Sequence, residues 1–151
     1  MPPPSALRVI LVAGLICGTL DALGATAGSA FFGRGPVRMF QGIASGVLGS
    51  RAFERGLAAA ALGLLLHFVV ATGAAAVFYF ASRAFPFLID HAPWVAPLYG
   101  AAVHTFMNFV VIPLSAIGQR PFQPRVFATF VVIAMVVVGP SIVLTVRYYS
   151  R

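Results

Sequence analysis

Residues 56–82 read GLAAAALGLLLHFVVATGAAAVFYFAS, and no charged side chain interrupts them between Arg55 and Arg83. About 20 predominantly apolar residues are enough for a helix to cross the hydrocarbon core of a bilayer, and this stretch is longer than that. Within lipid, the backbone N–H and C=O groups of an isolated span must be satisfied inside the segment, so it has to be a helix. The stretch therefore predicts a transmembrane helix.

The composition of the whole chain also indicates that the protein is surrounded by lipid. Of the 151 residues, 60% are hydrophobic and only 9% are charged, and the mean hydropathy is +0.98. A soluble domain carries about 25% charged residues. All ten basic residues are arginines, they stand apart from one another along the chain, and the formal net charge is +7. Arginines at the ends of apolar runs face lipid phosphates, so we expect membrane lipids, and no nucleic acid, as partners.

Three further runs are long enough to span the membrane, and we predict one transmembrane domain over residues 1–151. The four predicted spans cover residues of about 8–32, 56–82, 94–117 and 126–147. The expected fold is an all-α integral membrane four-helix bundle. The first loop contains PVRMFQGIASGVLG, which is too short to span. Because it opens with Pro36, which suits a first helical turn, it predicts a short re-entrant or interfacial helix.

The distribution of arginines predicts an orientation in the membrane. The first and third loops together hold six arginines, whereas the two termini and the second loop hold four, including Arg151. Cytoplasmic loops carry the excess of positive charge in membrane proteins. We therefore expect the first and third loops in the cytoplasm and both termini outside.

Polar side chains fall near the middle of three of the predicted spans. Asp21 lies in the first span, His67 in the second, and His104 and Asn108 lie one helical turn apart in the third. A charge at the bilayer centre costs on the order of 3 kcal/mol, so we expect Asp21 to face inward and to bond His67, His104 or both. Such groups often carry protons or cations, but they also serve simply to hold helices together by hydrogen bonds of about 1 kcal/mol.

Small residues recur on the first span at spacings of three and four residues. Gly14, Gly18 and Gly28 follow this spacing together with Asp21 and Ala25. Small residues on one face of a membrane helix let another backbone approach closely. We therefore predict that these glycines pack against helices within the chain or between chains, in a homo-oligomer.

Three functions are compatible with these patterns. The first is transport of a small solute or ion, or a proton relay, through the layer of Asp21, His67, His104 and Asn108. The second is a non-catalytic membrane assembly or lipid-binding component, for which Arg34 and Arg38, near the predicted helix start, are the candidates for binding a headgroup. The third is a b-type haem electron carrier with His67 and His104 as axial ligands.

The motifs of common enzymes do not occur in the chain. It has no lysine, no two histidines at H-x-x-x-H spacing and no G-x-S-x-G element. Outside the haem alternative, we therefore expect no catalytic residues, no metal site and no cofactor, and a protein that is not an enzyme.

Three segments carry a resemblance to known proteins. They are GLICGTLDALGA at residues 14–25, GLLLHFVVATGAAAVFYFAS at residues 63–82 and LYGAAVHTFMNFVVIPLSAIG at residues 98–118. The chain resembles, over most of residues 8–118, a group of small uncharacterised bacterial multi-pass inner-membrane proteins, with a more distant likeness to the YagU-type inner-membrane proteins. The resemblance implies a bacterial inner-membrane location and assigns no role to any residue.

Overall fold

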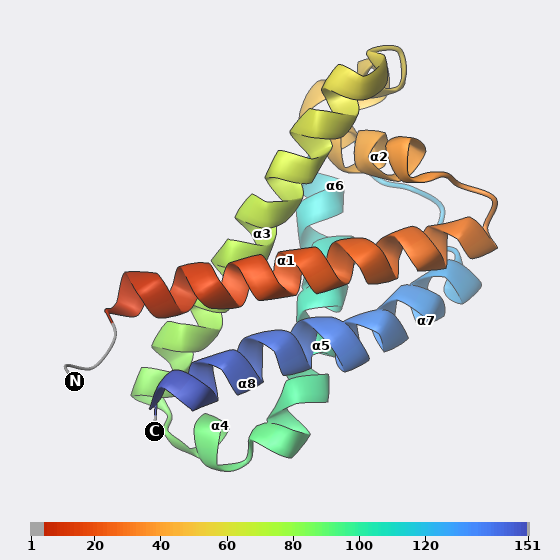
Figure 1. Cartoon of the computed structure of the whole chain (residues 1–151). Helices are drawn as coiled ribbons and strands as arrows, with labels where there is room; N and C mark the ends of the chain where they lie inside the picture. Colours follow the sequence, from red (N-terminus) through yellow and green to blue (C-terminus); the bar gives the residue numbers. More distant parts are fainter. Residues whose placement is uncertain (1–4, 151) are drawn as a thin grey trace.

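The computed structural model describes residues 5–150, and the helices dominate it (Figure 1). In chain order they are α1 (Ala6–Phe31), α2 (Pro36–Leu48), η1 (Gly49–Phe53), α3 (Gly56–Ala84), α4 (Phe87–Asp90), α5 (Ala92–Phe106), η2 (Met107–Val111), α6 (Ile112–Leu114), α7 (Pro124–Ile133), η3 (Ala134–Val138) and α8 (Gly139–Ser150). Arg151, which entered the count of arginines, lies outside the described residues.

Four helices in the described part of the chain are long and apolar enough to cross a membrane. They are α1, α3, the continuous helix α5–η2–α6 over Ala92–Leu114, and the continuous helix α7–η3–α8 over Pro124–Ser150. No strand occurs within residues 5–150. The predicted all-α four-helix bundle is therefore confirmed.

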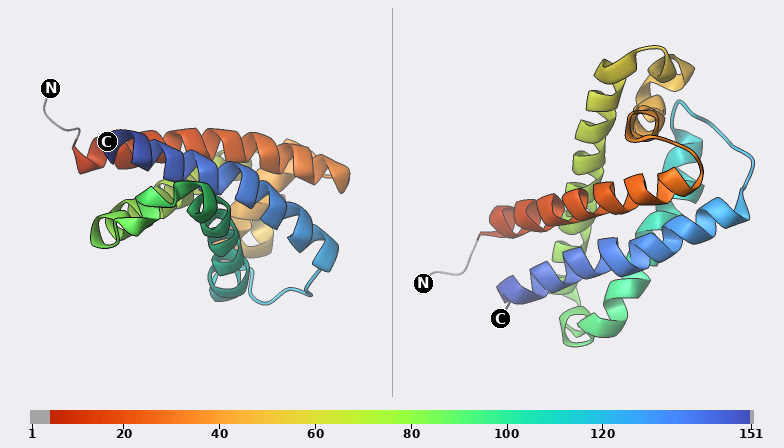
Figure 2. Two further views of the ribbon diagram at one scale, coloured as in Figure 1. Left: turned by 90° about the horizontal axis from the view of Figure 1, so that it is seen from below. Right: turned by 45° about the vertical axis from the view of Figure 1, so that its right-hand side comes forward.

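The four long helices form two antiparallel pairs in two layers. The helix α1 runs beside η3 and α8 in the opposite direction, and this pair forms one layer (Figure 1). The helices α3 and α5–α6 form the other layer and cross the first pair at a steep angle (Figure 2). The short helix α2 packs against the beginning of α3, at the end of the molecule opposite α4.

Many large apolar side chains face outward from this bundle, and alanines are frequent among the buried residues, together with a few larger ones such as Phe78 and Ile142. Leu57 is 74% exposed and Val136 is 68% exposed, whereas Ala13, Ala75 and Ala92 are fully buried. In water, these exposed apolar side chains would not contribute the hydrophobic burial that stabilises the core of a soluble protein. In lipid, where the tails are as apolar as leucine, close packing of small residues holds the helices together instead. The structure thus has the side-chain distribution of a membrane protein.

Two helix crossings are so close that they require glycine. A Cβ atom on Gly100 of α5 would collide with the carbonyl of Ala134, and one on Gly139 of α8 would collide with the carbonyl of Ala96. In the same way, Gly63 of α3 faces the carbonyl of Phe40 on α2. These contacts fix α5 against α8 and α2 against α3.

The ends of the helices follow local signals. Ser5 precedes α1, and its Oγ accepts a hydrogen bond from the backbone N–H of Arg8 at 3.3 Å. The predicted short helix in the first loop is α2, with Pro36 in its first turn. The third long helix ends at Leu114 and not near residue 117, because Ser115 has an extended backbone and Gly118 turns the chain with a φ of +68°.

Two wide π-helical turns interrupt the last two long helices. The turn η2 ends at Val111, two residues before Pro113, and the turn η3 ends at Val138, two residues before Pro140. Proline has no N–H to donate, and its ring crowds the carbonyl four residues earlier, so the preceding turn widens. Turns of this kind are frequent at functional sites in membrane and soluble helices.

Candidate functional site

A cavity of about 570 Å³ lies among the helices, and residues of α1, α2, α3, α5, η2, α7 and η3 line it. Both π-helical turns contribute to its wall, through Met107 and Asn108 of η2 and through Ala134 and Val138 of η3. Its ionisable and polar lining residues are Cys17, Asp21, Ser29, Arg34, Arg38, His67, His104, Asn108 and Arg120. All four residues of the predicted polar layer thus face one cavity.

Asp21 of α1 and His67 of α3 lie together in this cavity. The His67 Nε2 atom is 3.9 Å from Oδ2 of Asp21 and 2.9 Å from the carbonyl oxygen of Gly18. A carbonyl oxygen only accepts hydrogen bonds, so Nε2 of His67 carries a proton and donates it to Gly18. The side chain of His67 is 10% exposed and that of Asp21 is 26% exposed.

This geometry suits a proton relay through His67, in which the ring takes up a proton at one nitrogen and releases one from the other. Because Nε2 of His67 donates to Gly18, the Nδ1 atom is the one that can accept a further proton. The protonated ring can then release a proton from Nε2 towards Asp21. The 3.9 Å gap exceeds the length of a direct hydrogen bond, and a water molecule in the cavity would bridge it.

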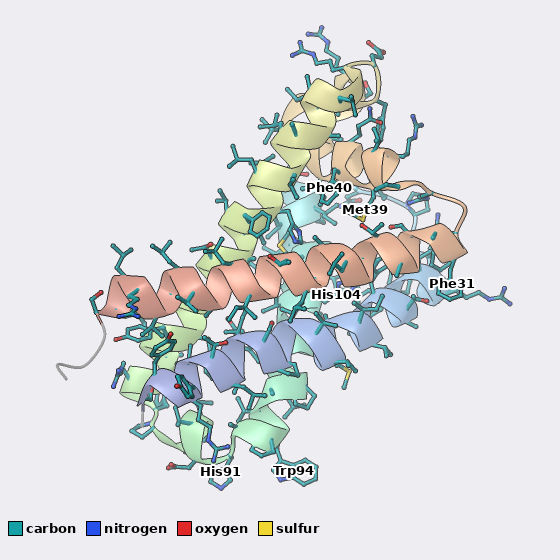
Figure 3. All side chains as sticks on the ribbon, in the orientation of Figure 1. Phe31, Met39, Phe40, His91, Trp94 and His104 are labelled. Carbon is teal, nitrogen blue, oxygen red and sulfur yellow. The ribbon has the colours of Figure 1, made fainter. Side chains whose placement is uncertain are left out.

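His104 and Asn108 form a second polar pair on α5 and η2. The Asn108 Nδ2 group donates to the His104 carbonyl at 2.9 Å and lies 3.1 Å from Nε2 of His104. An amide N–H only donates, so Nε2 of His104 is the acceptor and the neutral ring carries its proton on Nδ1. The ring also packs against Phe127 and Phe130. Figure 3 labels His104 near the middle of the molecule.

The two polar pairs share the cavity without touching. Within residues 5–150, no hydrogen bond or ion pair joins Asp21 to His104. Of the two expected partners of Asp21, the structure places His67 next to it and leaves His104 further away. The haem alternative would use Nε2 of both histidines, and both atoms already have hydrogen-bonding neighbours. Across the described part of the chain, no three His, Cys, Asp or Glu side chains group as metal ligands do.

The three glycines predicted for helix packing meet two different helices. A Cβ atom on Gly14 would lie 2.5 Å from Oγ1 of Thr72, and one on Gly18 would lie 2.5 Å from the ring of Phe68, both on α3. A Cβ atom on Gly28 would lie 2.7 Å from Ile133 of α7. The close approach at Gly18 also brings its carbonyl within reach of the histidine of α3.

Other sequence candidates lie at the ends of the bundle. Arg34 and Arg38 line the end of the cavity that α2 covers, and Arg120, from the segment after α6, joins them there. No sequence pattern pointed to Arg120, because it is far from the first loop along the chain. His91 lies with Trp94 at the opposite end of the molecule (Figure 3), where its Nδ1 pairs with the carbonyl of Phe87.

These observations define a multi-pass membrane protein of the all-α class, with a cavity among its helices that is lined in part by ionisable side chains. No family model matches the chain, and neither the curated proteins nor the solved structures include a significant match to it. The likeness to small bacterial inner-membrane proteins therefore stays a prediction from the sequence.

Proposed function

We propose that this protein carries protons, or a small solute together with protons, through the cavity by way of Asp21 and His67. The observation that carries the proposal is the placement of these two groups side by side in a cavity inside the bundle. A carboxylate and an imidazole exchange a proton readily near neutral pH, and intramembrane ionisable groups typically mark pathways for ions and protons. We place the protein in a bacterial inner membrane, where a proton gradient is present to drive such a process.

The surroundings of the pair support this assignment over a purely structural role. A structural bond between helices needs one donor and one acceptor, and His67 already meets that need through the carbonyl of Gly18. The carboxylate of Asp21 is left facing the cavity, where it can be hydrated. The π-helical turns η2 and η3 in the cavity wall provide wider and more adaptable helix segments.

Proton flux into liposomes tests the proposal. The purified protein is reconstituted with a pH-sensitive dye trapped inside, and a potassium gradient with valinomycin supplies the driving force. We expect flux several-fold above that of protein-free liposomes, and its loss in Asp21→Asn. Asp90→Asn is the matched control, because Asp90 is an exposed carboxylate outside the cavity. Flux that does not exceed the protein-free level, or that survives in Asp21→Asn, would overturn the proposal.

A further inference from the structure

Three exposed arginines from two distant parts of the chain line the same cavity. Arg34 precedes α2, Arg38 lies in the first turn of α2, and Arg120 lies in the segment after α6. That segment is bonded to α2: the backbone N–H of Ala116 donates to the carbonyl of Gly46 at 2.9 Å. The fold therefore holds Arg120 against α2 and close enough to Arg34 for their charges to interact.

Further contacts orient these arginines. The Nη2 group of Arg120 lies 3.4 Å from the hydroxyl of Ser45 on α2, a residue 75 positions earlier in the chain. The guanidinium of Arg38 lies over the ring of Phe53, 4.5 Å from its centre. Such a stacked guanidinium keeps its N–H groups in a fixed plane and free to donate at its edge.

The positive charge of this cluster is uncompensated. Within residues 5–150, no carboxylate forms a salt bridge with Arg34, Arg38 or Arg120. Partial burial and the neighbouring charge of Arg34 hold the pKa of Arg120 below its usual range. Arginine nevertheless stays charged at neutral pH, so an anion that bound among the guanidinium groups would relieve this repulsion.

An aromatic cavity adjoins the arginine cluster. It has a volume of about 530 Å³, and Arg34 and Arg120 belong to its wall as well as to that of the first cavity. Its other side is lined by Phe109, Phe122 and Phe127, whose ring centres lie 5.4 to 5.9 Å apart. A ligand bound at the arginines would thus have apolar surface directly beside its anionic group.

We propose that Arg34, Arg38 and Arg120 bind the phosphate group of an amphiphilic ligand whose apolar part lies among Phe109, Phe122 and Phe127. Three guanidinium groups match the several oxygens and the double charge of a phosphate monoester better than the single charge of a carboxylate. The proposal rests on the proposed function in that it names the ligand class of the same cavity. A membrane lipid and a soluble phosphate ester share this chemistry.

Binding in detergent micelles tests the proposal and separates the two sources. Calorimetric titrations compare three probes: oleoyl lysophosphatidic acid, inorganic phosphate, and oleoyl lysophosphatidylcholine, which has the same chain with no net charge. We expect the first to bind most tightly, the second more weakly and the third least. We expect each arginine variant to bind lysophosphatidic acid with an affinity lower by about tenfold or more, since each substitution removes a charge-assisted hydrogen bond. The three variants are Arg34→Gln, Arg38→Gln and Arg120→Gln.

Two controls locate the site. Arg51→Gln removes an arginine of the first loop that lines neither cavity, and it should leave binding unchanged. Phe122→Ala should lower the affinity for lysophosphatidic acid and leave the affinity for inorganic phosphate unchanged. Size-exclusion profiles and unfolding midpoints show that each variant is folded, and Arg120→Lys, which keeps the charge without the planar fork, should bind at an intermediate level.

Three results would overturn the proposal: lysophosphatidylcholine binding as tightly as lysophosphatidic acid, unchanged affinity in the arginine variants, or lysophosphatidic acid binding no more tightly than phosphate and with no sensitivity to Phe122→Ala. The last result would assign the site to free phosphate. The wild-type protein separates the two proposals. If it binds lysophosphatidic acid at the arginines but shows no proton flux in liposomes, the proposed function alone fails. If it shows flux that is lost in Asp21→Asn but binds lysophosphatidic acid no better than lysophosphatidylcholine, the ligand proposal alone fails.

Discussion

The Nε2 atom of His67 lies 3.9 Å from Oδ2 of Asp21, within a cavity that the crossed helix pairs leave inside the bundle. The pair has two forms that carry the same number of protons, a neutral acid beside a neutral ring and an ion pair. In a site of low dielectric, these two forms are closer in energy than they are in water, since separating the charges gains less solvation. A proton can therefore pass between the carboxyl group and the ring with a small change in free energy.

The first prediction concerns the ring of His67. Glutamine can donate to the carbonyl of Gly18 as His67 does, but it cannot gain or lose a proton. His67→Gln should keep the unfolding midpoint near that of the wild type and abolish proton flux in liposomes. His91→Gln, which changes the histidine at the far end of the molecule, should retain flux. Wild-type flux in His67→Gln would show that the ring only holds α3 against α1.

The second prediction concerns the crossing of α5 and α8. A Cβ atom on Gly100 has no room against the backbone of Ala134, so Gly100→Ala should lower the free energy of unfolding by about 1–3 kcal/mol. Gly73→Ala is the control, because nothing lies within 4 Å of a Cβ at that position and alanine favours the helix. Unfolding of both variants by sodium dodecyl sulfate in mixed micelles measures the difference. Equal stability would mean that the two helices do not cross so closely.

The third prediction concerns the attachment of α2. Gln41 is 5% exposed, and its Nε2 donates to the carbonyl of Gly56 at the start of α3. Gln41→Leu should lower the free energy of unfolding by about 1 kcal/mol in the same assay. Gln123→Leu, at an exposed position, should change it by less than about 0.5 kcal/mol. A variant at Gln41 as stable as the one at Gln123 would argue against this contact.

The fourth prediction concerns orientation. In a Cys17→Ser background, Asp90→Cys should react with a membrane-impermeant maleimide added to intact bacterial cells. Ser50→Cys, in the first loop, should react only after the membrane is permeabilised, because the arginine-rich loops are expected in the cytoplasm. The reverse pattern would place the first loop outside.

Much of the fold could be predicted from the length of apolar runs. A stretch without charge that exceeds the bilayer thickness has to be a helix, so the second span, predicted at 56–82, matches Gly56–Ala84 closely. The first proline of the first loop likewise marked the start of α2. The ends were less accurate where hydropathy continues past the helix, as at residues 115–117.

Contacts between elements could not be predicted in the same way. Sequence spacing placed Asp21, His67 and His104 at similar depth, but only the packing of α3 against α1 decides that His67 is the near neighbour. The approach of Arg120 to Arg34 depends on how the segment after α6 docks on α2. The close crossing at Gly100 could not be predicted either, because the local sequence around a helical glycine does not show whether another helix packs against it.

The central claim is that the carboxyl group of Asp21 takes up a proton inside the cavity. Dicyclohexylcarbodiimide, an apolar reagent, adds to protonated carboxyl groups within membranes and leaves an adduct that intact-protein mass spectrometry detects. We predict one adduct on the wild-type protein in liposomes, located on Asp21, absent in Asp21→Asn, and formed more slowly as the pH rises and the carboxyl group ionises. An adduct on Glu54 or Asp90 that persists in Asp21→Asn, or no adduct at all, would contradict the claim.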